Sequence, residues 1–99
     1  MFGKSKTDEL KPPPGAISGG GKEVLRAFIV DKGLQVSLRR GFDDPATWGL
    51  MLVDIARHAA RIFANETGYS EREALDRISK AFLAEWNHST DQGSTREVH

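Results

Sequence analysis

The stretch of residues 33–48 constrains the fold most, because it changes from strand periodicity to helix start signals within a few residues. Apolar side chains first alternate with polar ones, the period of two typical of a half-buried strand, at Leu34, Val36 and Leu38. Asp44 and Pro45 then supply a helix N-cap and a proline at the first helical position. The stretch therefore predicts a strand followed directly by a helix, and it defines no function.

Residues 23–30 also have the composition of a strand, with mostly apolar side chains on both faces. Asp31, Lys32 and Gly33 join the two segments, and a three-residue loop that ends in glycine is typical of a type I turn followed by a left-handed bulge glycine. We therefore predict an antiparallel hairpin. Because a lone two-stranded hairpin is marginal in water, it must pack on helices or pair with another edge.

A long helix is expected from Pro45 to Glu66 or Thr67, with Gly68 as its left-handed C-terminal cap. One face of this helix carries apolar side chains, at Trp48, Met51, Leu52, Ile55, Ala59, Ile62 and Phe63. An adjacent facet carries mostly small side chains, at Gly49, Val53, Ala56 and Ala60. Together they cover more than half of the circumference, so the helix must contact two surfaces, and we expect the small facet to be an interface.

A second helix is expected to begin after Ser70 and to end near Asn87. Ser70 and Glu73 have the spacing of a capping box, in which each side chain bonds the main-chain amide of the other residue. Apolar side chains recur along one stripe, at Leu75, Ile78, Phe82 and Trp86. Aromatic residues at helical spacing usually belong to the core, so we expect Trp48 and Trp86 to brace the helices against the hairpin.

These elements predict one α+β domain over residues 23–87, an antiparallel β-hairpin followed by two α-helices packed on one face of it. Residues 1–22 contain Pro12-Pro13-Pro14 and a run of glycines, which favour a flexible N-terminal arm. Residues 88–99 show no periodicity, so a disordered C-terminal tail is expected.

Length and charge narrow the function classes. The chain has 99 residues, no cysteine, and 14 basic residues that balance 14 acidic ones. Nucleic-acid binding usually needs a basic field, so we expect no nucleic-acid partner. No secretory leader or membrane-spanning run is evident, and the default location is the cytoplasm. A core of this size seldom yields more than about 3–5 kcal/mol of net stability, which favours a homodimer that buries further apolar surface.

Four segments together resemble a family of small bacterial proteins catalogued as a domain of unknown function: FGKSKTDEL, VLRAFI, GLQVSLRRGFDDPATWGLMLVDIARHAA and AFLAEW. The resemblance covers residues 2 to about 87. It implies an α+β fold. It implies no activity, cofactor or catalytic residue that could be carried over to this chain.

The first candidate site is the pair Arg39 and Arg40 just before the long helix, together with Asp44. A helix N-terminus presents unpaired amides and a positive dipole end, and two arginines beside it could clamp a phosphate or carboxylate. The competing interpretation is structural, because Asp44 and Asp43 already occupy the place that an anion would take.

A second candidate is the pair Asp54 and His58, four residues apart on the long helix. They could share a hydrogen bond that orients the imidazole for proton transfer. No nucleophile accompanies them at a matched spacing, and a solvated helical face with local ion pairs fits the same residues. One helix offers two metal ligands only, so neither a metal nor another cofactor is expected.

The sequence therefore favours a non-enzymatic protein-interaction or regulatory module that acts as a homodimer or binds another protein. The alternative is a binder of small anionic ligands at Arg39 and Arg40. Catalysis by Asp54 and His58 is the third hypothesis, and no catalytic residue is assigned.

Overall fold

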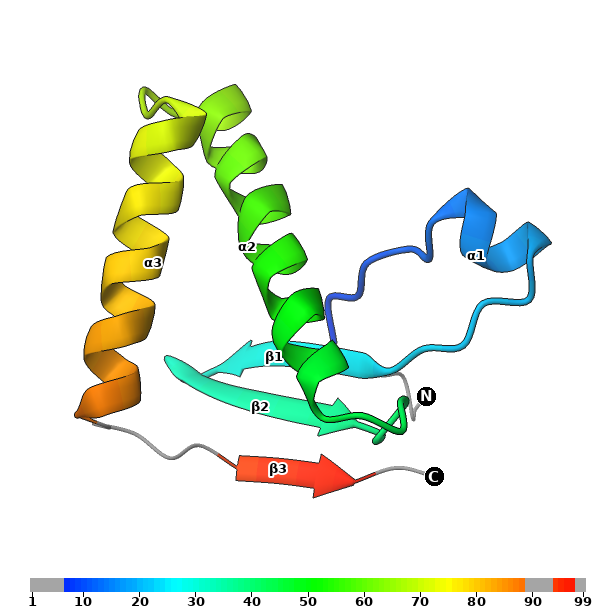
Figure 1. Ribbon diagram of the computed structural model, residues 1–99. Coiled ribbons are helices and arrows are strands. Elements are labelled where there is room, and N and C mark those ends of the chain that lie inside the picture. Colours follow the sequence, from blue (N-terminus) through cyan, green and yellow to red (C-terminus); the bar gives the residue numbers. More distant parts are fainter. Residues whose placement is uncertain (1–6, 89–93, 98–99) are drawn as a thin grey trace.

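The computed structural model describes residues 7–88 and 94–97 and has the predicted α+β order of a hairpin followed by two long helices (Figure 1). The hairpin consists of β1 (Leu25–Val30) and β2 (Gly33–Leu38). The helices are α2 (Ala46–Glu66) and α3 (Glu71–Asn87). A short helix, α1 (Pro14–Ser18), precedes the hairpin, and a short strand, β3 (Ser94–Glu97), follows the helices.

The hairpin turn differs from the prediction of a three-residue loop. Gly33 pairs with Val30 as part of β2, which leaves a loop of two residues, Asp31 and Lys32. Their φ angles are 50° and 67°, and positive φ at both central positions is the mark of a type I′ turn. The prediction was wrong because the backbone twist of a type I′ turn matches the twist of the strands. That match outweighs the strain of placing two non-glycine residues in the left-handed region.

We predict that Lys32→Gly stabilises the hairpin, because Asp-Gly is a preferred type I′ pair and glycine removes left-handed strain worth about 1–2 kcal/mol. Glycine also costs unfolded-state entropy, so the net gain in the free energy of unfolding should be roughly 0.5–1 kcal/mol by chemical denaturation. Lys32→Val is the matched control: it removes the same charge, and its β-branched side chain should destabilise. Equal effects of the two substitutions would contradict the turn assignment.

The sheet has three strands in the order β1-β2-β3. β1 and β2 are antiparallel, with Ala27 opposite Val36, and β3 adds to the other side of β2 in parallel. The expected C-terminal tail thus includes a strand that the sequence pattern did not predict; residues 89–93 and 98–99 lie outside the described residues. Likewise, α1 lies within the arm predicted to be flexible. Because β3 occupies the far side of β2, β1 forms the outer edge of the described sheet.

The helix α2 begins as the sequence predicts and ends differently. Pro45 already has helical φ and ψ, and the Asp44 carboxylate accepts the main-chain N–H of Ala46 at 2.9 Å. At the other end Gly68 does not adopt the predicted left-handed conformation. Thr67 is extended instead, and both its N–H and its hydroxyl donate to the carbonyl of Phe63, at 2.9 and 2.6 Å. A glycine cap is unnecessary because these donors already satisfy that carbonyl.

Two glycines should respond oppositely to alanine. Gly41 has a φ of 74°, and a Cβ there would lie 3.1 Å from Cγ1 of Val24, so Gly41→Ala should destabilise by roughly 1 kcal/mol or more. Gly68 has open space and no positive φ, so Gly68→Ala should stabilise by about 0.4–1 kcal/mol through the unfolded chain. Thermal unfolding of both variants tests this. Destabilisation by Gly68→Ala would contradict the observed cap and support a left-handed conformation at Gly68.

The helix α3 begins with the predicted capping box. The Ser70 hydroxyl accepts the N–H of Glu73 at 3.0 Å, and the Glu73 carboxylate accepts the N–H of Ser70 at 2.9 Å. The main-chain hydrogen bond from Ser70 holds the pKa of Glu73 below its ordinary value. One turn further along the same helix, Asp76 and Lys80 form an exposed ion pair at 3.0 Å.

The lowered pKa gives the capping box a defined pH dependence. Its contribution should be complete above the unfolded-state pKa of glutamate and lost as the pH falls through the lower folded-state pKa. Glu73→Ala should therefore reduce the free energy of unfolding at neutral pH, and its difference from wild type should shrink in acid. Glu66→Ala, at an exposed position outside the box, is the control. A difference that stays constant with pH for Glu73→Ala would contradict the assignment.

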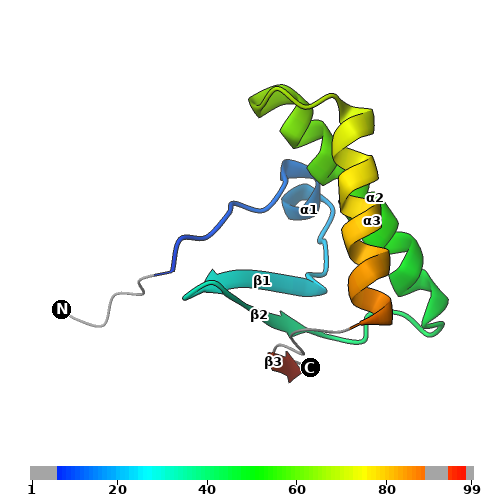
Figure 2. The ribbon, with the colours of Figure 1, turned by 90° about the vertical axis from the view of Figure 1, so that its left-hand side faces the viewer.

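The two helices meet near the loop of residues 67–70 and diverge toward the strands (Figure 1). Ala60 of α2 and Ala74 of α3 are the buried residues of the described chain, at 0% and 4% exposure. Nearby, Arg61 pairs with Glu71 at 3.6 Å. Both helices lie on one side of the strands (Figure 2). Among the described helices and strands, no Cα atom of a helix lies within 8 Å of a Cα atom of a strand. The protomer therefore has a small core confined to the closed end of the helix pair.

Most of the large apolar side chains of the helices remain accessible to solvent. The exposed ones on the two helices are Leu50, Leu52, Val53, Ile55, Ile62, Phe63, Phe82, Leu83 and Trp86. Trp86 is 75% exposed, so the expectation that it braces the helices against the hairpin was wrong. The reason is the divergence of the helices, which carries the last turn of α3 away from α2.

Candidate functional site

The start of α2 forms one side of an open hollow of about 610 Å³. Basic, acidic and aromatic side chains line it together, and they are Lys22, Arg40, Gly41, Phe42, Asp43, Asp44 and Thr47. The positive φ of Gly41 turns the chain between β2 and α2, and this turn places Phe42 edge-on against Trp48 with ring centroids 6.1 Å apart. The hollow is the place where the sequence predicted an anion site.

The polar groups of Arg40, Asp43 and Asp44 in this hollow already have partners. The amide of Ala46 donates to Asp44, and the Arg40 guanidinium lies 3.7 Å from the Asp43 carboxylate. The Arg40 carbonyl accepts the indole N–H of Trp48 at 2.6 Å. Because the carboxylate of Asp44 takes a main-chain amide at the helix start, an incoming anion would have to displace it. The geometry therefore supports the structural interpretation of Asp44.

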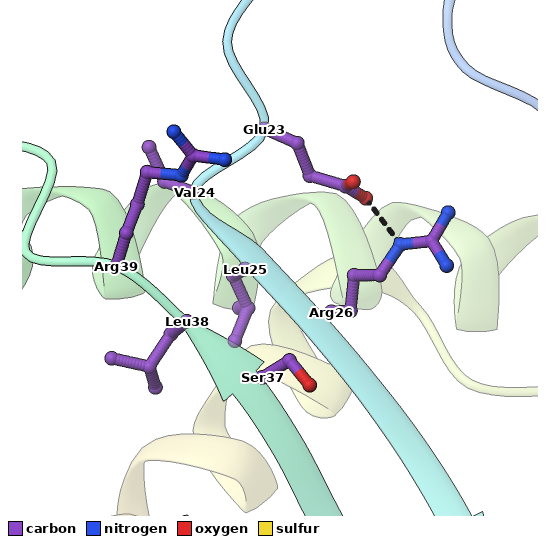
Figure 3. A pocket seen from close by; sticks show the side chains of 7 residues that line it. All are labelled: Glu23, Val24, Leu25, Arg26, Ser37, Leu38 and Arg39. Carbon is purple, nitrogen blue, oxygen red and sulfur yellow. Dashed lines mark hydrogen bonds and ion pairs between the residues drawn. The ribbon is translucent and has the colours of Figure 1, made fainter. Parts of the chain in front are cut away.

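The structure separates Arg39 from Arg40. Arg39 lines a different and smaller hollow at the base of the hairpin, beside the ends of β1 and β2 (Figure 3). Its main-chain N–H donates to the carbonyl of Val24 at 3.1 Å and extends the hairpin by one pair. In the same hollow Arg26 bonds Glu23 at 2.9 Å and also reaches Glu9 at 3.1 Å. The two-arginine clamp predicted from the sequence is not assembled in this conformation.

The predicted pair of Asp54 and His58 is not brought together either. The Nδ1 atom of His58 lies 3.3 Å from the guanidinium of Arg61, and both side chains are exposed. Arg61 also reaches Glu71 of α3. These contacts give a solvated face of local polar pairs, in line with the structural interpretation of His58.

The small facet predicted as an interface divides into two parts. Ala60 is fully buried within the protomer, where α3 is the element that packs against α2, so this residue is not available to a partner. Ala56 is half-buried, whereas Gly49 and Val53 are exposed. The N-terminal half of the facet therefore remains a candidate contact surface, and its C-terminal half belongs to the helix pair.

A larger apolar surface emerges beside it. Phe82 and Trp86 stack with ring centroids 5.7 Å apart, and they remain 49% and 75% exposed. On α2 the apolar arc is also exposed, at Leu52, Ile55, Ile62 and Phe63. The sequence contained the signal for this surface, since both stripes have clean helical spacing. It could not show that the helices diverge and leave the stripes uncovered.

Comparison with known proteins shows the family. The model of the family described as Domain of unknown function (DUF5076) matches residues 9–90, and the chain belongs to this family. A solved structure with the description "Structure of a putative pyruvate dehydrogenase from the photosynthetic bacterium Rhodopseudomonas palustrus CGA009" is similar to it. The two sequences are 45% identical, the match covers 96% of this chain and 100% of that one, and the TM-score is 0.74. The comparison with curated proteins finds no match.

Two further features of the described residues bear on the site. No helix among them is long and apolar enough to cross a membrane. Within the same residues no three metal-ligating side chains gather into a cluster. The feature that stands out in the described part of the chain is thus the exposed apolar surface of α2 and α3.

Proposed function

We propose that this protein is a non-enzymatic protein-interaction or regulatory module that acts as a homodimer. The observation that carries the proposal is the contrast between its two buried alanines and the large apolar side chains left exposed along both helices. Exposed apolar surface beyond scattered single residues marks interaction sites in soluble proteins. Association would supply the core that one copy lacks.

The size of the exposed surface supports the same conclusion. A compact monomer of 10.9 kDa is expected to expose about 5,600 Å². This chain exposes 8806 Å², and its radius of gyration is 15.7 Å where about 12.6 Å is expected for its length. A standard interface removes about 1,200–2,000 Å² from water, which this surface can provide.

The chemistry of the remaining candidates supports a binding role over catalysis. His58 faces Arg61, and the carboxylate of Asp44 occupies the helix start that an anion would need. A bacterial origin is proposed from the solved relative and a reducing, cytoplasmic location from the lack of cysteine. The proposal of a homodimer does not depend on the origin or the location of the protein.

The proposal predicts that a charge on the exposed part of α2 prevents association. Val53 is 49% exposed, and Val53→Glu would place a carboxylate inside the contact at a cost of about 1–3 kcal/mol, which weakens association roughly tenfold or more. Light scattering over a concentration series measures the mass of each variant.

Asn65→Glu is the matched control, because it adds the same charge on the polar side of the same helix. We expect the wild type and Asn65→Glu to be dimeric and Val53→Glu to dissociate at higher concentration. A wild-type chain that stays monomeric over the series would contradict the homodimer, and equal masses for both variants would remove Val53 from the contact.

A further inference from the structure

The outer edge of β1 presents main-chain hydrogen-bonding groups that nothing in the described chain pairs with. The two-residue turn makes Val30 and Gly33 the closing hydrogen-bonded pair, and the alternation then continues to the bond between Val24 and Arg39. Every second residue of β1 therefore directs its N–H and C=O groups toward β2, and the residues between them direct these groups away from it. The residues that direct them away are Leu25, Ala27 and Ile29.

This edge has few of the features that normally prevent strand addition. It contains no proline, Arg26 is its one charged residue, and the Ile29 side chain is 76% exposed. Glu9 of the arm reaches the Arg26 side chain at 3.1 Å, but this ion pair is about half exposed. No main-chain bond joins the described part of the arm to β1. A six-residue edge with these properties is suited to pairing with another strand.

We infer that β1 of a second copy occupies this edge, antiparallel and centred on Ala27, so that the two sheets become continuous. The inference rests on the homodimer proposed above and specifies how its copies join. In this register Ala27 faces Ala27 of the second copy and Leu25 faces its Ile29. Arg26 faces the Phe28 ring of the second copy, over which a guanidinium can lie. Each residue whose N–H and C=O groups point away from β2 exchanges both hydrogen bonds with such a residue of the second copy.

The alternative registers are less favourable. A twofold axis at Arg26 would place the two arginines directly opposite each other, and like charges at opposed positions destabilise a strand pair. An axis at Phe28 would pair Leu25 with Asp31, which belongs to the turn. The Ala27 register matches an apolar or cationic residue with an apolar one along the whole strand. It therefore uses the edge most completely.

The twofold axis of such a pair is perpendicular to the sheet, because opposed residues of an antiparallel pair share one face. Both helices lie on one side of the strands in each copy (Figure 2). The helices of both copies therefore come to the same side of the joined sheet. This arrangement pairs the open edge and brings the exposed helix faces of both copies to the same side of the joined sheet.

Two substitutions at Ala27 test the edge. Ala27→Pro removes an N–H that directs away from β2, so the hairpin keeps its own ladder while the edge loses its central donor. Ala27→Val keeps the donor and is the control for the change in side chain. Light scattering should give a monomer for Ala27→Pro and a dimer for Ala27→Val, and far-ultraviolet circular dichroism should show that both are folded.

The absence of native cysteine allows a second, independent test. In the proposed register the two Cα atoms of residue 27 lie about 5.5 Å apart, a separation that a disulfide can span. Ala27→Cys should form a covalent dimer on mild oxidation, whereas Gln35→Cys, exposed on the central strand β2, should not. This readout does not depend on the tolerance of the strand for proline.

The outcomes separate this inference from the homodimer itself. A dimeric wild type, loss of the dimer in Ala27→Pro and selective cross-linking of Ala27→Cys support the edge contact. A dimeric wild type that survives Ala27→Pro and does not cross-link at residue 27 overturns the edge contact and leaves the homodimer standing. A monomeric wild type overturns both the edge contact and the homodimer, and an extended segment of a different protein would then be the candidate for the edge.

Discussion

The packing of α2 against α3, in which Ala60 and Ala74 are the buried residues of the described chain, is the interaction on which the rest of the protomer depends. Two small side chains allow the helices to approach near the loop that joins them, and the ion pair between Arg61 and Glu71 lies at the same end. Beyond this point the helices diverge, so their apolar stripes do not meet. The well-packed region is therefore limited to the end of the helix pair near residues 67–70, and the rest of both helices is poorly packed.

This distribution explains why the sequence contains more apolar residues than one copy buries. Burial of apolar area is the main favourable term in folding, and a chain that leaves Ile55, Phe82 and Trp86 in water forgoes much of it. Selection for solubility normally removes such residues from free surfaces. Their presence at regular helical spacing fits surfaces that another copy covers.

The sequence predicted what local chemistry determines. The hairpin, both helices and the capping box of Ser70 and Glu73 follow from periodicity and start signals within a few residues. The errors lie where local alternatives are close in energy. Asp31 and Lys32 form a two-residue turn in place of a bulged one, and Thr67 caps the helix where Gly68 was expected.

Long-range geometry was beyond the pattern. Residues 94–97 gave no signal of a strand, because their place in the sheet depends on β2 being near and not on their own alternation. The separation of Arg39 from Arg40 depends on the main-chain bond between Arg39 and Val24, which extends the strand by one pair, so that these two successive side chains lie on opposite faces and line different hollows. The uncovered faces of α2 and α3 depend on the angle between the helices, which neither stripe encodes alone.

The central claim is that one copy does not bury enough to fold stably by itself. The most direct measurement is the midpoint of chemical denaturation over a wide range of protein concentration. When folding and association are coupled, the folded state gains stability by mass action, so the midpoint should rise with concentration. A midpoint that does not change with concentration would show that a single copy is stable alone and would contradict this account.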